Sequence, residues 1–336
     1  MNEEKTDEKY MRRCLQLARC GRLGAAPNPM VGAVIVHDGR IIGEGYHRRC
    51  GEAHAEVNAV ASVAPEDKGL LRQSTLYVSL EPCAHYGKTP PCAQLIIDIG
   101  IPCVVVGCRD PFAHVDGRGI NMLREAGIEV REGVLEKECL YLNRRFITFH
   151  TLRRPFITLK WAQSEDGFID RCRVSREEPP VCVSTPVTQA LVHQLRADHE
   201  AILIGRRTKE LDAPSLTVRY WHGKNPLPVV IEKGGFRIGN EDFVIDEGKN
   251  GMDAGAEVLL RPLMEKLWNR GVQSLLVEGG AKTLQGFIDT GLWDEARIET
   301  SSMRLGHGVA APHIEGKRIG GMEIDGNHIV YLQKNP

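Results

Sequence analysis

The 336-residue chain lacks a long apolar run, a strong net charge and internal repeats. No uninterrupted hydrophobic stretch approaches the roughly 20 residues that a membrane helix needs, and the first residues, MNEEKTDEKY, are charged. A formal net charge of −1 provides no overall field for collecting nucleic acid or anionic membrane. We therefore expect a soluble, cytoplasmic protein that binds neither nucleic acid nor membrane. The sequence does not determine the oligomeric state, and a homo-oligomer is one of the open alternatives.

The sequence also lacks the pattern of a disulfide-rich secreted protein. It has ten cysteines, but the chain is long and shows no signal peptide, which favours free thiols and metal ligands over disulfides. Eight of the cysteines have no ligand-like neighbours, and we expect them to be small, mostly buried hydrophobic residues. These eight are Cys14, Cys20, Cys50, Cys103, Cys108, Cys139, Cys172 and Cys182.

The length exceeds what one hydrophobic core usually covers, so we expect two domains, at residues 1–150 and 154–336. In the first, β-branched runs alternate with helical patterns, which predicts a layered α/β domain. An Asp38-Gly39 pair between the first two runs predicts a hairpin. Strands are expected at 31–36, 40–46, 75–80 and 103–107, and helices at 7–21, from about 54, from 91, at 118–126 and at 134–150.

A similar alternation follows Arg153-Arg154-Pro155, which marks the expected boundary, and predicts a second α/β domain. Pro, Gly and Asn cluster at 221–226 and 233–255, which predicts exposed loops there. Strands are expected at 156–162, 201–205, 227–231, 256–260 and 274–280, and helices at 186–197, 261–270 and 281–290.

Three stretches of the first domain carry the residue types of a catalytic zinc site: His54-Ala55-Glu56, Pro82-Cys83 and Pro91-Cys92. One imidazole and two thiolates suit Zn²⁺, and three protein ligands leave the fourth position for water. A Glu that does not touch the metal can move protons while an amino group is hydrolysed from a heterocycle. We therefore predict His54, Cys83 and Cys92 as zinc ligands and Glu56 as the catalytic proton carrier.

The spacing of these residues predicts their positions. His54 and Glu56 are two residues apart, so they converge only near the start of a helix. Pro91 before Cys92 fits a helix N-terminus, where the macrodipole favours a thiolate. A structural zinc site is the main alternative, and the lack of an obvious fourth ligand argues against it.

The stretches PNPMVGAVIV, GYHRRCGEAHAEVNA and SLEPCAHYGKTPPC resemble the deaminase half of the bifunctional riboflavin-biosynthesis deaminase/reductase family. Cytidine and tRNA-adenosine deaminases share the HAE motif but typically have PCxxC, whereas eight residues, AHYGKTPP, separate the two cysteines here. The resemblance implies a cytidine-deaminase-like, three-layer α/β/α domain and a phosphorylated pyrimidine as substrate. It also implies substrate contacts at Asn28, His47, His85 and Lys88. Asn28 before a proline could instead be a turn residue, and Lys88 a solvated loop charge.

Residues from Arg154 to about Pro312 resemble the reductase half of the same family, in RPFITLKWAQSEDG, HQLRADHEAILIG, RTKELDAPSLTVR and LLVEGGAKTLQGFIDTGLWDE. The resemblance implies a dihydrofolate-reductase-like α/β fold with NADPH as cofactor. The implied NADPH-side positions are Ala162, Thr208, Asp212, Gly280, Ala281, Lys282, Thr283, Leu284, Gln285 and Gly286. The implied substrate-side positions are Arg196, Leu216, Arg219 and Glu278.

Elementary chemistry supports some of these positions. Residues 277–280, Val-Glu-Gly-Gly, end a strand and open a helix, so their free backbone N–H groups could receive a phosphate, although a tight turn would look the same. Arg196 and Arg219 could bind a ribose phosphate bidentately or be surface charges. Lys160 could polarise the ribose carbon that accepts hydride, or it could form a structural ion pair.

The second domain departs from the usual family pattern in four places. SEDG replaces SLDG at 164–167, GRRT replaces GxGT at 205–208, Asp-Ala-Pro replaces Asp-Asp-Pro or Asp-Asn-Pro at 212–214, and EEPPVCVS replaces a stretch with Ser and Trp at 177–184. Arg206 and Arg207 could favour the 2′-phosphate of NADPH or lie in a solvated turn.

We expect a two-step enzyme of riboflavin synthesis, a zinc-dependent deaminase followed by an NADPH-dependent reductase. Three alternatives remain open. The second domain could bind substrate or support a dimer without reducing anything. The chain could be a nucleoside or tRNA-base deaminase, which would predict a basic face and the short cysteine spacing. It could also be a non-catalytic, zinc-stabilised interaction protein.

Overall fold

The computed structural model describes residues 3–84, 90–110, 117–245 and 256–335. The chain divides into two compact units, Met1–Leu152 and Arg153–Pro336. In the described ranges, no helix is both long enough and apolar enough to cross a membrane.

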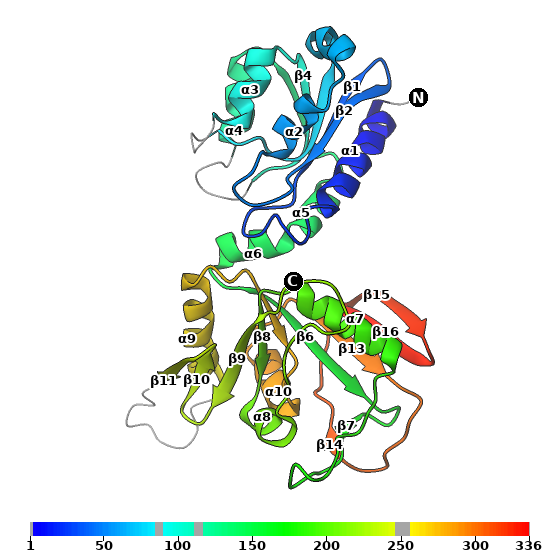
Figure 1. The fold of residues 1–336 in the computed structure, drawn as a ribbon, viewed down its shortest axis with the longest axis vertical. Helices are drawn as coiled ribbons and strands as arrows, with labels where there is room; N and C mark the ends of the chain where they lie inside the picture. The colour runs from blue at the N-terminus through cyan, green and yellow to red at the C-terminus, as the bar shows by residue number, and fades with distance from the viewer. Residues whose placement is uncertain (1–2, 85–89, 111–116, 246–255, 336) are drawn as a thin grey trace. The chain divides into compact units, whose positions relative to one another are not determined.

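The first unit is built on a five-stranded mixed sheet (Figure 1). Its strands are β1 (Gly32–His37), β2 (Arg40–Tyr46), β3 (Thr75–Leu80), β4 (Cys103–Cys108) and β5 (Glu129–Glu132). Their order is β2-β1-β3-β4-β5, with β1 antiparallel to both neighbours and β3, β4 and β5 parallel to one another. The β1–β2 hairpin turns at Asp38 and Gly39, with φ of 46° and 75°, as the Asp-Gly pair predicts.

Helices cover both faces of this sheet. They are α1 (Glu3–Arg19), α2 (Ala55–Ala61), the 3₁₀ helix η1 (Pro65–Gln73), α3 (Cys92–Ile99), α4 (Arg118–Glu125), α5 (Glu136–Leu142) and α6 (Arg144–Leu152). Because strand side chains alternate, Val34 packs with α1 and α5 on one face, and Ile35 packs with α2, α3 and α4 on the other. The expected cytidine-deaminase-like, three-layer α/β/α arrangement is confirmed.

The prediction of a single helix at 134–150 is wrong, because the segment forms two helices, α5 and α6, divided at Asn143. The Asn143 side chain is 3% exposed, accepts a hydrogen bond from the Met30 N–H (2.8 Å) and donates one to the Met30 carbonyl (2.9 Å). The amphipathic pattern could not reveal this break, since the partner lies 113 residues away.

The second unit contains a nine-stranded mixed sheet and a two-stranded one (Figure 1). Its strands are β6 (Phe156–Gln163), β7 (Phe168–Asp170), β8 (Ala201–Ile204), β9 (Leu227–Glu232), β10 (Gly235–Ile238), β11 (Glu241–Val244), β12 (Ser274–Val277), β13 (Glu295–Thr300), β14 (Val309–Ala310), β15 (Lys317–Ile324) and β16 (Asn327–Gln333). The large sheet has the order β11-β10-β9-β8-β12-β6-β13-β16-β15, and β7 pairs with β14. From β9 to β13 the strands are parallel, which is the expected dihydrofolate-reductase-like α/β architecture.

Helices cover the two faces of the large sheet unequally. They are α7 (Pro186–Ala197), α8 (Arg206–Asp212), α9 (Ala256–Asn269) and α10 (Ala281–Asp289). The main apolar core joins α9 and α10 to Ile157, Leu159 and Trp161 of β6. The other face has only a small apolar cluster, around Ile202 and Leu276, against which Leu195 of α7 packs. The face toward α7 is therefore largely available for polar groups.

Two expectations for this unit are wrong. The strand expected at 256–260 is the first part of α9, which includes the 261–270 segment as well. Leu260, Leu263 and Leu267 recur at helical spacing and are buried, and Glu257 pairs with Arg261 one turn on (2.6 Å). The loop expected at 233–255 contains the β10–β11 hairpin in its described part. A short apolar run does not distinguish a strand from a buried helix turn.

The expectation of mostly buried cysteines is also wrong. Four of the eight assigned to the core are exposed, namely Cys20, Cys50, Cys172 and Cys182. Cys14, Cys108 and Cys139 are buried as expected, and Cys103 is intermediate.

Candidate active sites

The predicted zinc ligands meet at the ends of three elements of the first unit. His54 is the N-cap of α2, Cys83 follows β3, and Cys92 is the first residue of α3 after the N-cap Pro91. β3 and α3 belong to the sheet and the helical layer that enclose one apolar core. The backbone thus brings together residues that lie 29 and 38 positions apart.

The geometry of the three side chains fits a tetrahedral zinc ion. The His54 Nδ1 atom lies 3.6 Å from Cys83 Sγ and 3.4 Å from Cys92 Sγ, and all three donor atoms lie within 4.8 Å of one another. Zinc bonds of the usual lengths, about 2.3 Å to sulfur and about 2.0–2.1 Å to nitrogen, separate N and S by about 3.5 Å. The Cys92 backbone N–H also donates to Cys83 Sγ (3.3 Å), which stabilises a thiolate.

Glu56 lies in the first turn of α2, directly beside this cluster. Its residue is 3% exposed and its carboxyl interacts with the Cys92 side chain. Without a metal, burial and the charge of Cys83 raise the pKa of Glu56 to about 7. His54 precedes the helix and Glu56 begins it, which is the arrangement that their spacing predicts.

Asn28 and His47, two of the predicted substrate contacts, bind each other next to the cluster. The Asn28 Nδ2 atom lies 3.0 Å from His47 Nε2, and His47 Nδ1 lies 3.1 Å from the Ala53 carbonyl oxygen. Because a carbonyl only accepts, Nδ1 carries the proton and Nε2 accepts from the Asn28 amide. Burial lowers the pKa of His47, whose ring centroid lies 5.4 Å from that of His54. His85 and Lys88, the other two predicted contacts, lie outside the described residues.

Glu81 has a positioning role that the sequence analysis missed. The residue is 4% exposed, and its carboxylate accepts hydrogen bonds from four backbone N–H groups, one just after β4 and three at the start of α4 and its N-cap. These donors are Asp110 (3.3 Å), Gly117 (3.0 Å), Gly119 (2.9 Å) and Ile120 (3.3 Å). The sequence did contain a signal for this role, because Glu81 is a carboxylate placed between a buried strand and the Pro82-Cys83 pair.

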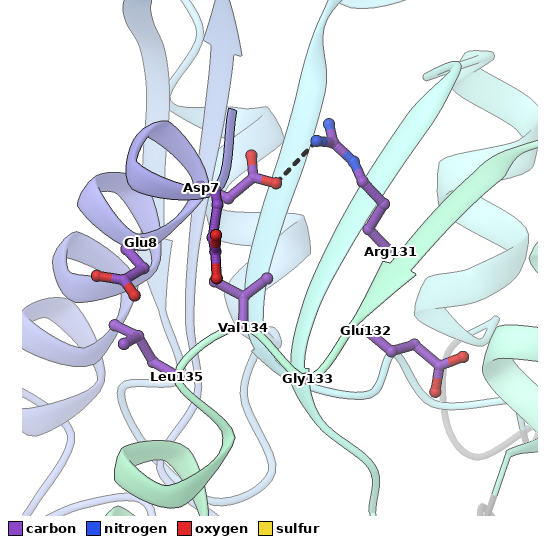
Figure 2. A pocket seen from close by; sticks show the side chains of 8 residues that line it. Asp7, Glu8, Arg131, Glu132, Gly133, Val134 and Leu135 are labelled. Atoms are coloured by element: carbon purple, nitrogen blue, oxygen red, sulfur yellow. Dashed lines mark hydrogen bonds and ion pairs between the residues drawn. The ribbon is translucent and has the colours of Figure 1, made fainter. Parts of the chain in front are cut away.

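A hollow of about 500 Å³ lies elsewhere in this unit, between the start of α1 and the end of β5 (Figure 2). Asp7 and Arg131 form an ion pair there (2.7 Å), and Asp7 also accepts from the Tyr77 hydroxyl (2.8 Å). α1 covers the sheet face opposite α2 and α3, so this hollow is not the zinc cluster.

In the second unit, three predicted residues meet on the sheet face toward α7. Arg196 of α7 donates through Nε and Nη2 to the two carboxylate oxygens of Glu278 (2.9 and 2.7 Å). Lys160 of β6 is half-buried and interacts electrostatically with both. Burial lowers the pKa of Lys160, partly offset by Glu278. Burial would raise the pKa of Glu278, but the Arg196 hydrogen bond and the charges of Lys160 and Arg196 lower it.

The other two predicted substrate residues differ in character. Leu216 is 7% exposed and lies in the small apolar cluster with Ile202 and Leu276. Arg219 is exposed, and its guanidinium interacts with the Ser215 hydroxyl and, at 3.3 Å, with the Thr217 hydroxyl. Among the described residues, Arg219 thus has hydroxyl partners and no carboxylate partner.

The predicted cofactor residues other than Asp212 lie on β6, in α8 and along the first part of α10. The Thr208 hydroxyl accepts from the Gly280 N–H (3.0 Å), and a side chain on Gly205 would overlap the Thr283 hydroxyl, so the starts of α8 and α10 lie side by side. Ala281 and Gly286 are half-buried and Lys282 is exposed, whereas Leu284 is fully buried and Gln285 is bonded to His313 (2.9 Å). Ala162, half-buried on β6, lies opposite Glu299 in the sheet.

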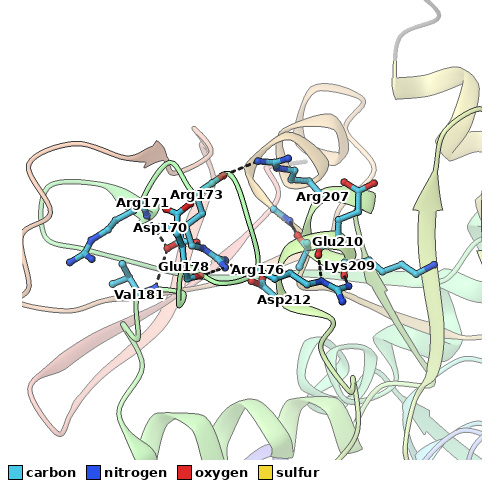
Figure 3. A network of polar contacts seen from close by, with 12 residues as sticks. Asp170, Arg171, Arg173, Arg176, Glu178, Val181, Arg207, Lys209, Glu210 and Asp212 are labelled. Atoms are coloured by element: carbon cyan, nitrogen blue, oxygen red, sulfur yellow. Dashed lines mark hydrogen bonds and ion pairs between the residues drawn. The ribbon is translucent and has the colours of Figure 1, made fainter.

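Asp212, the remaining cofactor position, is held by the residues just before the 177–184 stretch that departs from the family pattern (Figure 3). Arg173 is 6% exposed and binds Asp170 (2.6 Å), Asp212 (2.5 Å) and the Glu178 carbonyl (3.2 Å). Arg176 donates to the Lys209 carbonyl (3.0 Å) and to that of Glu210, at the end of α8. Arg207 of α8 donates to the Arg173 carbonyl (2.8 Å). We refer to residues 170–183 as the strap, which three arginines attach to α8 and which the sequence analysis did not anticipate.

Comparisons with known proteins agree with both halves. Residues 4–108 match the family of the cytidine and deoxycytidylate deaminase zinc-binding region, and residues 155–326 match the RibD C-terminal domain. The riboflavin biosynthesis protein RibD of Aquifex aeolicus is 36% identical over 90% of this chain and 89% of its own length. That of Escherichia coli K12 is 34% identical over 89% of each chain.

A solved structure has the same overall fold. The crystal structure of a diaminohydroxyphosphoribosylaminopyrimidine deaminase/5-amino-6-(5-phosphoribosylamino)uracil reductase from Thermotoga maritima is 34% identical. It superposes with a TM-score of 0.83 over 99% of this chain and 100% of the other. With a zinc-binding deaminase region that contains His54, Cys83 and Cys92 and a reductase region in one chain, the protein belongs to the RibD family of riboflavin biosynthesis.

Proposed function

We propose that this chain is a bifunctional deaminase and reductase that acts on two successive intermediates of riboflavin synthesis. The first unit would hydrolytically deaminate 2,5-diamino-6-(5-phosphoribosylamino)pyrimidin-4(3H)-one. The second would then reduce the ribosyl group to ribityl. The observation that carries this proposal is the His54, Cys83 and Cys92 cluster with the buried Glu56 beside it. The family assignment favours it over a nucleoside deaminase and over a non-catalytic zinc protein.

In the deaminase unit, His54, Cys83 and Cys92 would hold zinc, which supplies an activated water when bound. Glu56 would take a proton from that water, deliver it to a ring nitrogen and then assist the departure of ammonia. The Asn28 amide, oriented by His47, would read the pyrimidinone edge. Glu81 would hold the loop before Cys83 in place through the start of α4.

In the reductase unit, NADPH supplies hydride when bound, and the start of α10 would receive its phosphates through backbone N–H groups. Thr208 and Asp212 would lie on the cofactor side. Arg206 and Arg207 at the start of α8 would favour NADPH over NADH, although Arg206 also pairs with Glu210 (3.0 Å) and Arg207 donates to the Arg173 carbonyl (2.8 Å).

The substrate side of this unit would use its two arginines differently. Arg196 is already engaged by Glu278 with two hydrogen bonds, so it would orient that carboxylate toward the ribose hydroxyls. Arg219 is exposed and bonded to hydroxyls, so it is the better ligand for the phosphate. Lys160 would stand next to the carbon that accepts hydride. Cytoplasmic localisation and a homo-oligomeric state stay predictions.

A direct assay tests the two activities separately. The purified chain is given the diamino substrate and NADPH, and ammonia release and NADPH oxidation are followed in parallel. Both are expected. Ammonia without NADPH consumption would remove the reductase assignment and leave the deaminase. No reaction would exclude this substrate and direct attention to other amino-heterocycles.

A substitution tests the catalytic use of the metal cluster. Glu56→Gln should abolish ammonia release while zinc stays bound, as measured by plasma mass spectrometry. Unchanged ammonia release would exclude Glu56 as the proton carrier. Ammonia release by the wild type but not by Glu56→Gln, with zinc retained in both, would exclude a non-catalytic structural metal.

A further inference from the structure

The sheet face toward α7 contains a buried layer of charged groups. This layer includes charged residues in addition to the predicted substrate contacts. Three cations and two carboxylates belong to it. They are Lys160 of β6, Arg196 of α7, Arg297 and Glu299 of β13, and Glu278 after β12. His193 of α7, 4% exposed, faces the same layer, and its Nδ1 accepts a hydrogen bond from the Arg219 N–H (2.8 Å), which is the role of a neutral imidazole. Burial together with Arg196 and Arg219 lowers its pKa. Glu295, two residues before Arg297 on the same side of β13, is a further carboxylate on this face.

Lys160 and Arg297 lie directly opposite each other across the parallel pair β6–β13. Residues in register on neighbouring strands point to the same face, and like charges in this relation repel each other. Arg297 is 1% exposed, whereas Lys160 is only half-buried. One cation of the pair is thus sealed in the protein, and the other reaches toward accessible space.

Glu299 satisfies the charge and the hydrogen-bond donors of Arg297 only in part. Arg297 Nη1 lies 3.2 Å from Glu299 Oε2, while Arg297 Nη2 is buried and has no hydrogen-bond partner among the described residues. Glu299 is 0% exposed, accepts from Asn327 Nδ2 at Oε1 (2.8 Å) and interacts with Thr188 of α7. Asn327 also donates to the Val183 carbonyl at the end of the strap (3.1 Å).

Such an arrangement costs stability. Well-packed apolar residues in place of a buried ion pair are often neutral or stabilising, and an unpaired buried N–H carries a further penalty. Strained or electrostatically unfavourable groups concentrate where a protein uses them. Lys160, which like Arg196 and Glu278 is only partly buried, is also the residue proposed to act on the substrate.

We propose that Arg297 and Glu299 are positioning residues for the reductase reaction, which set the charge of Lys160 from the buried side of the sheet. The inference rests on the proposed function of the second unit. Neither residue touches the substrate in this account, since both are sealed in the protein.

The charges around Lys160 give the direction of each effect. Burial lowers the pKa of Lys160; Glu278 and Glu299 raise it, and Arg297 and Arg196 lower it. Removing the charge of Arg297 must therefore raise this pKa, and removing that of Glu299 must lower it. Two substitutions at neighbouring positions thus act in opposite directions, which a general loosening of the fold would not produce.

The test measures the charge of Lys160 without using activity. The full chain is labelled with trace acetic anhydride at a series of pH values, and the fraction of acetylated Lys160 is quantified by peptide mass spectrometry. Arg297→Gln should raise the labelling midpoint by about one pH unit and Glu299→Gln should lower it by about one. Arg297→Lys keeps the charge and should keep the wild-type midpoint. Arg304→Gln, an exposed arginine, is the matched control.

The pH profile of NADPH oxidation with the deaminated intermediate gives the second readout. The limb of this pH profile that reflects the ionisation of Lys160 should shift in the same direction as the labelling midpoint. The pH profile of ammonia release should not change. Coinciding midpoints in the wild type and both neutral variants, or shifts in one common direction, would overturn the inference. If Arg297→Gln does not fold, Glu299→Gln and Arg297→Lys still decide it. A wild type that consumes no NADPH contradicts the proposed function itself, whatever the labelling shows.

Discussion

The two units of this chain assemble their functional residues in different ways. In the first, a small set of donor atoms converges within 4.8 Å, next to one buried carboxyl. In the second, the charged residues come from β6, α7, β13 and the end of β12, and most of them already bind one another. A metal site can be identified from its ligand types, whereas a charged network acquires its meaning only from the fold.

The largest expected effect is on the deaminase activity, and it comes from a substitution in the zinc cluster. Cys83→Ser should remove zinc and lower ammonia release at least as much as loss of a proton carrier does, about 10²- to 10⁴-fold. NADPH oxidation with the deaminated intermediate should not change. Zinc content and the two rates check this, with Cys20→Ser, an exposed cysteine, as control. Zinc retained at the wild-type level would break the assignment.

The next effect addresses the second unit. Lys160→Met should lower NADPH oxidation about 10²-fold, the lower end of what a positioned proton donor contributes, and should leave ammonia release unchanged. Steady-state rates at saturating cofactor measure it. The exposed Lys317→Met is the matched control. Equal rates for the wild type and Lys160→Met would assign Lys160 to a structural ion pair.

The third effect concerns stability. The Arg196 and Glu278 side chains are only 12% and 9% exposed, so Glu278→Ala leaves a buried cation without its bidentate partner. Loss of one partner of a buried pair costs about 3–5 kcal/mol, and urea unfolding should show this loss in the second unit. Glu257→Ala removes an exposed pair and should change little. Similar unfolding curves for both variants would mean that the Arg196–Glu278 pair is not a structural element.

The smallest effect tests the strap. Arg173→Met detaches Asp212 and loosens α8, so the KM for NADPH should rise a few-fold while kcat stays the same. Arg173→Lys should recover part of the affinity. A fall in kcat with an unchanged KM would show instead that the strap serves the chemical step.

Much of the first unit could be predicted from the sequence. Asp38-Gly39 specified its hairpin, and 40–46 and 75–80 coincide with β2 and β3. Pro91 and the HAE spacing placed the ligands at helix starts, because these signals are local. Glu81 and Asn143 escaped prediction because their partners are distant backbone groups that no local pattern contains.

The second unit was harder to predict for a related reason. Residues 256–260 are apolar in a way that suits both a strand and a helix, and only packing against the sheet decides. Arg173, Arg297 and Glu299 carry no motif, since each acquires its environment from strands or helices that are remote in sequence. The resemblance supplied Arg196 and Glu278, but their mutual binding emerged only from the fold.

One measurement tests the central claim, that two chemically independent sites share this chain. Ammonia release from the diamino substrate and NADPH oxidation with the deaminated intermediate are measured for the wild type, Glu56→Gln and Lys160→Met. We predict a double dissociation, in which Glu56→Gln loses only the first activity and Lys160→Met loses only the second. Loss of both activities in either variant, with the fold and the bound zinc intact, would contradict it.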